Sequence, residues 1–209
     1  MNTILFQGDS ITDCGRNREA AVNTPGHMGN GYVNLITSEL LGCNPAANYT
    51  CINKGISGNR VVDLYARWKV DALNWNPDFI SILIGVNDVW HEIGGHNGVE
   101  ADRFEQVYRM LLSWTKQVLP NVKLLIMEPF ALKSEVVDDA FIAEVRVRAA
   151  IAEKMAKEFN AVYLPLHDML TAAAEKAAPG YYSGDGVHPS LAGNKLIADA
   201  WLKAAAPLL

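Results

Sequence analysis

Short apolar runs alternate along the chain with longer segments in which apolar residues recur every three to four positions. Short runs of this kind are typical of buried strands, whereas the longer period is typical of amphipathic helices. The predicted strands cover residues 3–7, 49–53, 78–84, 122–127 and 161–164. The predicted helices cover residues 31–41, 61–73, 101–118, 138–159, 167–177 and 191–205.

Strands that alternate with helices form a parallel sheet, because each helix carries the chain back to the starting edge of the sheet. Right-handed crossovers then predict a three-layer α/β/α sandwich with a five-stranded parallel sheet of the flavodoxin-like kind. The 209 residues suffice for one full core, and no repeat, linker or low-complexity segment divides them. We therefore expect a single domain over residues 1–209.

Composition and charge narrow the possible functions. The formal net charge is −5 and no Lys/Arg cluster is present, so we expect no nucleic-acid or membrane partner. The apolar runs are too short to span a bilayer. We expect no export signal, and the three cysteines lack metal-type spacing. Reduced thiols and a cytoplasmic location are the resulting expectation.

Ligands of such sheets bind beyond the carboxyl ends of the strands, and chemically suggestive blocks follow four of the five predicted strands here. The blocks are GDS at 8–10, NKGISG at 53–58, GVND at 85–88 and DGVHP at 185–189. Singly, each has an ordinary explanation as a helix cap, a glycine turn, an Asx turn or a surface turn. Together they supply a nucleophile, N–H donors, an amide donor and an Asp/His pair, which acyl transfer requires.

Individual roles follow from this chemistry. Ser10 is the candidate nucleophile and His188 its candidate general base. Asp185, three residues before the histidine, can fix the tautomer of the imidazole and stabilise the imidazolium. Asn87 can direct its amide toward a developing oxyanion.

The order of these blocks resembles that of the SGNH/GDSL hydrolase family, named for serine, glycine, asparagine and histidine. The resemblance spans residues 8–189. It implies a triad of Ser10, Asp185 and His188. It also implies an oxyanion hole made by the N–H groups of Ser10 and Gly55 and the Asn87 side chain. The serine is outside a G-x-S-x-G elbow, so the chain does not resemble an α/β-hydrolase.

Within this family, GDSITDCGR, NKGISGN, DLYARW, IGVNDVW and GVHPS are similar to blocks of intracellular acetylxylan esterases. That resemblance implies a serine esterase that removes acetyl groups from saccharides such as xylo-oligosaccharides through an acyl-enzyme intermediate. Five residues near the blocks are expected to contact the substrate: Asp9, Arg16, Arg60, Trp90 and Tyr182.

Two alternatives stay open. One is a lysophospholipase or acyl-thioesterase with the same catalytic parts and a different pocket. The other is a non-catalytic carbohydrate-binding protein on the same scaffold, against which the complete set of catalytic residue types argues. A homo-oligomer is compatible with the sequence.

One further segment carries metal-ligating residue types. His91-Glu92 and His96 are spaced as HExxxH, not as the HExxH of zinc hydrolases. Gly94-Gly95 also argues against a continuous helix there, because glycine disfavours helix interiors. We therefore expect no metal and no other cofactor.

Overall fold

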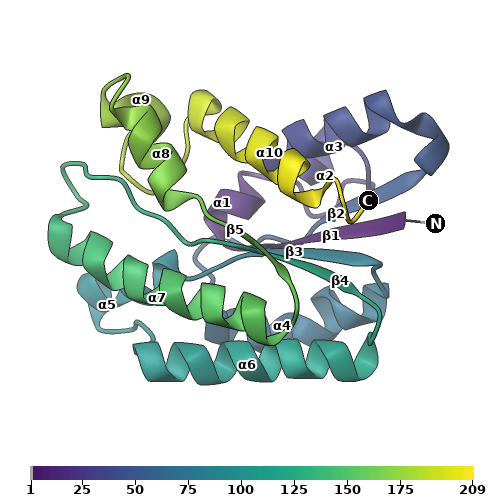
Figure 1. The fold of residues 1–209 in the computed structure, drawn as a ribbon, viewed down its shortest axis with the longest axis horizontal. Coiled ribbons are helices and arrows are strands. Elements are labelled where there is room, and N and C mark those ends of the chain that lie inside the picture. The colour runs from purple at the N-terminus through teal and green to yellow at the C-terminus, as the bar shows by residue number, and fades with distance from the viewer. Residues whose placement is uncertain (1) are drawn as a thin grey trace.

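The computed structural model describes residues 2–209 and contains one five-stranded parallel sheet (Figure 1). Its strands lie in the order β2-β1-β3-β4-β5, and every neighbouring pair is parallel. Their bounds are β1 (Asn2–Gly8), β2 (Tyr49–Asn53), β3 (Phe79–Leu83), β4 (Lys123–Met127) and β5 (Val162–Leu164). The predicted flavodoxin-like α/β/α sandwich is confirmed, and the strand order reverses at β1.

Helices cover both faces of the sheet (Figure 1). One face carries α3 (Tyr32–Cys43), α8 (His167–Ala174) and α10 (Leu191–Ala205), and the other α4 (Val61–Asp71), α6 (Ala101–Val118) and α7 (Asp139–Glu158). Successive strand residues point to opposite faces. Phe6 accordingly packs in the cluster under α3 and α10, and Leu5 in the cluster under α4 and α6.

The remaining helices are shorter: α1 (Ser10–Asp13), α2 (Pro25–Met28), α5 (Val86–Gly95), α9 (Pro179–Tyr182) and the 3₁₀ turns η1 (Pro45–Ala47) and η2 (Leu73–Trp75). The expectation that Gly94-Gly95 interrupts a helix is wrong, because α5 continues through both glycines. It ends at His96, which adopts a left-handed backbone with φ 51°. A glycine in a helix costs only about 1 kcal/mol relative to alanine, which the rest of α5 offsets.

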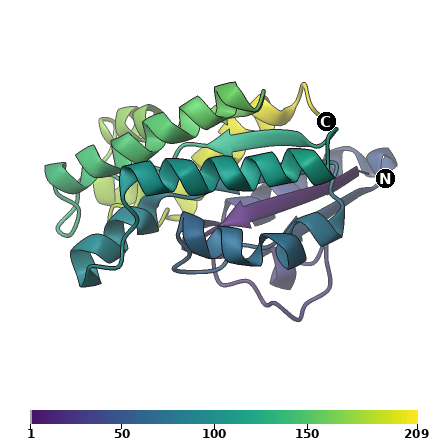
Figure 2. The ribbon, with the colours of Figure 1, turned by 90° about the horizontal axis from the view of Figure 1, so that it is seen from below.

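The carboxyl ends of the strands bring two predicted site residues to one edge of the sheet. In Figure 2 the arrow of β1 starts near the N-terminus on the right and points to the left. Helix α1 follows β1 and α5 follows the adjacent strand β3. Ser10 and Asn87 therefore lie in the first turns of two helices that start from neighbouring strands. No helix within residues 2–209 combines the length and apolarity needed to cross a membrane.

Candidate active site

The nucleophile turn between β1 and α1 is tightly packed. A Cβ at Gly8 would lie 2.3 Å from Thr12 Oγ1 and 2.4 Å from the Leu83 carbonyl oxygen, so only glycine fits there. Ser10 is half-buried and is the first residue of α1. The first N–H groups of a helix have no acceptor within it. The Ser10 N–H is therefore available to a ligand at the carboxyl end of β1.

The structure brings the three predicted triad residues together. Ser10 Oγ lies 2.8 Å from His188 Nε2, although the two residues are 178 positions apart. On the other side of the imidazole, His188 Nδ1 lies 2.6 Å from Asp185 Oδ2. A proton on Nδ1 that is donated to the carboxylate leaves the Nε2 lone pair directed at the serine hydroxyl. This is the arrangement that general-base activation of a serine requires.

The Asp185 carboxylate is held by its own loop. Its Oδ1 accepts the backbone N–H groups of Val187 at 2.9 Å and His188 at 2.8 Å. Partial burial raises the pKa of Asp185, but hydrogen bonds from the His188 ring and these two N–H groups outweigh it. The pKa of Asp185 lies below its ordinary value as a result. The carboxyl group is thus kept ionised and in position to stabilise an imidazolium.

The segment after β4 supports the loop that contains Asp185. This support was not predicted from the sequence. Ser134 Oγ donates to the Asp185 carbonyl at 2.8 Å, and the Leu132 N–H donates to the Gly186 carbonyl at 2.7 Å. Gly186 has φ 85°, and a Cβ there would lie 2.2 Å from the Leu132 carbonyl oxygen. The only signal in the sequence was a serine shortly after a predicted strand, which is too common to single out.

Gly55 does not have the geometry of an oxyanion donor. It is buried, and its N–H already donates to Asn53 Oδ1 at 2.9 Å. A Cβ at Gly55 would lie 2.3 Å from the Asp13 backbone nitrogen. The role that the family resemblance implied for Gly55 is therefore corrected. This glycine lets its loop pack directly against α1.

Gly58, in the same block, has the properties that Gly55 lacks. It adopts φ 82°, and a Cβ there would meet only His91 Cε1, at 3.9 Å. Among residues 2–209 the Gly58 N–H donates to no backbone carbonyl. The carbonyl of the next residue, Asn59, accepts from Asn87 Nδ2 at 3.1 Å. Gly58 thus replaces Gly55 as the candidate donor beside Asn87.

Asn87 and Asp88 join the start of α5 to the start of α4. The Asn87 side chain is 8% exposed, and the Asn59 carbonyl takes one of its two amide hydrogens, which leaves the other for a ligand. Asp88 is fully buried, and its Oδ1 and Oδ2 lie 3.0 and 3.3 Å from the Val61 nitrogen. Burial raises the pKa of Asp88 to about 7. Asp88 thus joins the two loops that carry the candidate donors Gly58 and Asn87.

Two predicted substrate contacts are corrected by the structure. Asp9 is 1% exposed, and its Oδ1 caps α1 by accepting from the Ile11 N–H at 3.0 Å. Burial raises the pKa of Asp9 to about 7. Arg60 donates through Nε and Nη2 to Asp63 and through Nη1 to Asn97. Asp9 is thus a helix cap, and Arg60 ties α4 to the segment after α5.

The other three candidates lie nearer to the surface. Arg16 is half-buried and donates through Nε to the Gly55 carbonyl at 2.8 Å, so it supports the glycine loop. Tyr182 is half-buried, with its ring 5.1 Å from that of Tyr181. The Trp90 ring centroid lies 6.4 Å from that of His188. Trp90 is therefore the candidate for which the structure shows a position beside the triad.

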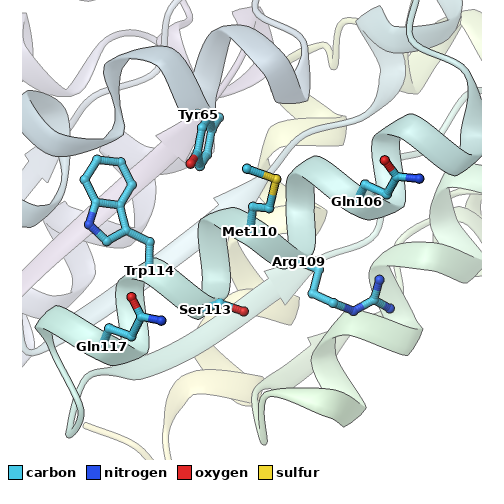
Figure 3. A pocket seen from close by; sticks show the side chains of 7 residues that line it. All are labelled: Tyr65, Gln106, Arg109, Met110, Ser113, Trp114 and Gln117. Carbon is cyan, nitrogen blue, oxygen red and sulfur yellow. The ribbon is translucent and has the colours of Figure 1, made fainter.

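Two other features lie away from these residues. The side chains of His96 and Glu92 are exposed, with Nδ1 and Oε1 3.5 Å apart. Within residues 2–209 no three His, Cys, Asp or Glu side chains are arranged to hold a metal ion. A groove of about 680 Å³ lies on α4 and α6, where Tyr65 faces Met110 and Trp114 (Figure 3). No histidine is among its lining residues, so its Ser113 has no general base.

Known proteins with similar sequences agree with the geometry of this candidate active site. Residues 6–196 match the GDSL-like lipase/acylhydrolase family. An acetylxylan esterase from Geobacillus stearothermophilus is 33% identical over 204 residues, which cover 96% of this chain and 92% of that protein.

Solved structures that resemble this chain lead to the same family. A protein from Parabacteroides merdae that is named as GDSL-like lipase superposes with a TM-score of 0.94 at 41% identity, covering 98% of this chain and 95% of that one. Axe2, an acetylxylan esterase from Geobacillus stearothermophilus, superposes with a TM-score of 0.89 at 32% identity, covering 97% and 93%. The chain therefore belongs to the GDSL-like lipase/acylhydrolase family and is a carboxylic ester hydrolase.

Proposed function

We propose that this protein is a serine esterase that removes acetyl groups from saccharides of the xylo-oligosaccharide kind, through an acyl-enzyme on Ser10. The observation that carries the proposal is the continuous line of hydrogen bonds from Asp185 through His188 to Ser10 Oγ, with distances of 2.6 and 2.8 Å. This line ends at the carboxyl edge of the sheet, where ligands of such folds bind.

In the first half of the reaction, Ser10 Oγ attacks the acetyl carbonyl carbon while His188 Nε2 takes the hydroxyl proton. Asp185 stabilises the imidazolium. The oxyanion accepts hydrogen bonds from the N–H groups of Ser10 and Gly58 and from Asn87 Nδ2. The intermediate collapses when the bond between the carbonyl carbon and the saccharide oxygen breaks. His188 gives its proton to that oxygen, and the saccharide leaves as an alcohol.

The second half releases acetate. A water molecule gives a proton to His188 Nε2 and attacks the carbonyl carbon of acetyl-Ser10. The same donors stabilise the second oxyanion. When the bond to Ser10 Oγ breaks, His188 returns the proton to the serine, and acetate leaves. The three residues thereby return to their starting state.

Two observations favour an acetylated saccharide as the substrate. The side chains of His188 and Asp185 are 51% and 40% exposed, so the site is open enough for an ester on a bulky alcohol. The Trp90 ring beside His188 offers an aromatic surface against which a sugar ring can pack.

Variants of the relative Axe2 support the same catalytic assignment. Solved structures of Axe2 include catalytic mutants in which a serine, an aspartate or a histidine is changed to alanine. The aspartate lies three positions before the histidine in Axe2, the same spacing as Asp185 and His188.

We place the reaction in the cytoplasm, with which three free thiols at Cys14, Cys43 and Cys51 are compatible.

The test is acetate release from a panel of acetylated saccharides, together with an acyl-chain series of aryl esters. We expect turnover of acetylated xylo-oligosaccharides, and acetyl esters cleaved much faster than octanoyl esters. The opposite chain-length order, without saccharide turnover, would replace the proposal with a lysophospholipase or thioesterase function.

A further inference from the structure

A hollow of about 360 Å³ lies on α5 and the segment that follows it. It is a shallow hollow that is widely open to solvent. The residues that line it are Trp90, His91, Gly94, Gly95 and Asn97. None of the triad residues lines this hollow, so it is separate from the reacting atoms.

Two residues that line the hollow lie near the candidate catalytic centre. Trp90 connects it to the triad, because its ring lies 6.4 Å from the His188 ring. His91 connects it to the oxyanion loop, because its Cε1 would lie 3.9 Å from a Cβ at Gly58. A ligand in the hollow can therefore extend directly from an ester group bound at Ser10.

The periodicity of helix α5 also indicates that a ligand in the hollow can contact an ester bound at Ser10. Residues three to four positions apart share one face of a helix, so Asn87, Trp90, His91 and Gly94 form one stripe. Asn87 is the candidate oxyanion donor. With a rise of 1.5 Å per residue, the stripe extends roughly 10 Å from Asn87 to Gly94. An acetyl group is much shorter than this, so the stripe is long enough to contact the alcohol part of the ester.

The two glycines have no structural requirement of their own. Neither Gly94 nor Gly95 adopts a positive φ. A Cβ added to either residue would meet nothing within 4 Å. Glycine lowers helix stability by about 1 kcal/mol relative to alanine, yet two follow each other in the last turn of α5. Both glycines are accounted for if they form the flat floor of a site that a bound ligand covers.

The walls of the hollow suit a neutral, hydroxyl-rich ligand. The Trp90 ring is held nearly perpendicular to that of Phe141, with centroids 5.5 Å apart. The Asn97 side-chain oxygen accepts from Arg60 Nη1 at 2.8 Å, which leaves the amide hydrogens for a ligand. No lysine, arginine or carboxylate is among the five lining residues. An aromatic face with an amide donor is suited to a sugar ring.

We infer that this hollow is the subsite for the saccharide part of the ester, with Trp90 as the stacking surface and Gly94-Gly95 as the floor. The inference rests on the proposed function and adds to it the place where the sugar binds. The inference means that α5 determines the specificity for the alcohol part of the ester.

Filling the floor tests this subsite. Gly94→Leu places a side chain into the hollow at a position where nothing else is displaced. The matched control is Gly42→Leu, because Gly42 is an exposed glycine of α3 that also has nothing within 4 Å. Each protein is assayed with an acetylated xylo-oligosaccharide and with p-nitrophenyl acetate. The readout is the ratio of kcat/KM for the saccharide ester to that for the aryl ester.

We expect Gly94→Leu to lower this ratio by at least about tenfold, mainly through KM for the saccharide, as loss of ground-state binding does. Gly42→Leu should keep the ratio of the unchanged protein. Thermal melting verifies that each variant is folded, and Gly95→Leu repeats the test from the adjacent position if Gly94→Leu does not fold.

Three outcomes are distinguishable. A lowered ratio for Gly94→Leu alone supports the subsite. A ratio that stays unchanged in the folded floor variant, while the protein deacetylates the saccharide, overturns the subsite and leaves the esterase function in place. Turnover of p-nitrophenyl acetate without any turnover of acetylated saccharides overturns both the subsite and the proposed substrate.

Discussion

The two halves of the candidate catalytic centre are held in place in different ways. On the acid–base side, Asp185 and His188 bond to each other and to the backbone of their own loop, and both side chains are half-exposed. On the oxyanion side, Gly58 and Asn87 come from separate loops. The buried carboxylate of Asp88 and the amide of Asn87 join these loops.

This difference predicts how each half responds to substitution. A side chain on the exposed half can be removed with little loss of packing, so its variants should change chemistry almost alone. A side chain on the buried half both acts and positions its neighbours, so its variants should change chemistry and stability together. The predictions below test this contrast, from the largest expected effect to the smallest.

The largest effect is expected at the triad. Ser10→Ala or His188→Ala should lower kcat by about four to six orders of magnitude, as removal of triad members does in other serine hydrolases. The melting temperature should change little, because the His188 side chain is half-exposed. Steady-state kinetics and thermal melting give the two numbers. Full activity of Ser10→Ala would exclude the proposed mechanism.

Asn87→Ala should have the next largest effect. Loss of an oxyanion donor lowers kcat by about a hundred- to a thousandfold with KM little changed, because the contact strengthens only in the transition state. The lost bond to the Asn59 carbonyl should lower stability by about 1 kcal/mol at the same time. A destabilised variant that keeps its kcat would mean that Asn87 only holds the loop.

Asp9 is the buried carboxyl group of the nucleophile turn, and its ionisation should appear in the pH dependence of stability. Burial raises the pKa of Asp9 to about 7 in the folded protein, whereas an unfolded aspartate has a pKa of about 3.9. The folded state therefore binds more protons than the unfolded state between these values, and stability falls as the pH rises through this window.

Asp9→Asn retains an oxygen that can cap α1 and does not ionise. The stability of the variant minus that of the unchanged protein should therefore increase by about 2.6 kcal/mol from pH 5 to pH 8. Denaturant unfolding at several pH values measures this difference. A difference independent of pH would show that Asp9 is ionised throughout and that burial does not control its titration.

The two glycines of the oxyanion loop should differ by a smaller amount. Gly55→Ala requires a backbone shift, because the new Cβ would lie 2.3 Å from the Asp13 nitrogen. We expect it to cost about 2–3 kcal/mol, as overpacking does. Gly58→Ala adds only the strain of a left-handed backbone, about 1–2 kcal/mol.

Amide chemical shifts show which glycine is the donor. Covalent modification of Ser10 by a phosphonate places an anionic oxygen in the oxyanion hole. The Gly58 N–H resonance should then move much further than that of Gly55. A larger change at Gly55 would restore the assignment that the family resemblance implied.

The sheet and the contact between Asp185 and His188 were predictable because their signals are local. Each strand is a short apolar run, and the five predicted strands and six predicted helices are present with ends displaced by a few residues at most. Asp185 and His188 are three residues apart in one loop, so sequence spacing alone placed them together.

Features that depend on contacts between loops were not predictable in this way. Gly55 and Gly58 are equivalent in a sequence, and only packing against α1 and the free N–H distinguish them. From the sequence, Arg60 was predicted to contact the substrate. Its bonds to Asp63 and Asn97 are seen only in the structure. Helix α5 was missed because two adjacent glycines normally indicate a turn, and the helix tolerates them in its exposed last turn.

The identity of the nucleophile can be measured most directly by labelling with a serine-directed fluorophosphonate, followed by intact-mass and peptide mass spectrometry. The account predicts one adduct per chain, on Ser10, that forms in parallel with the loss of esterase activity and forms far more slowly in His188→Ala. Inactivation with the label on another residue, or full labelling of Ser10 without loss of activity, would contradict it.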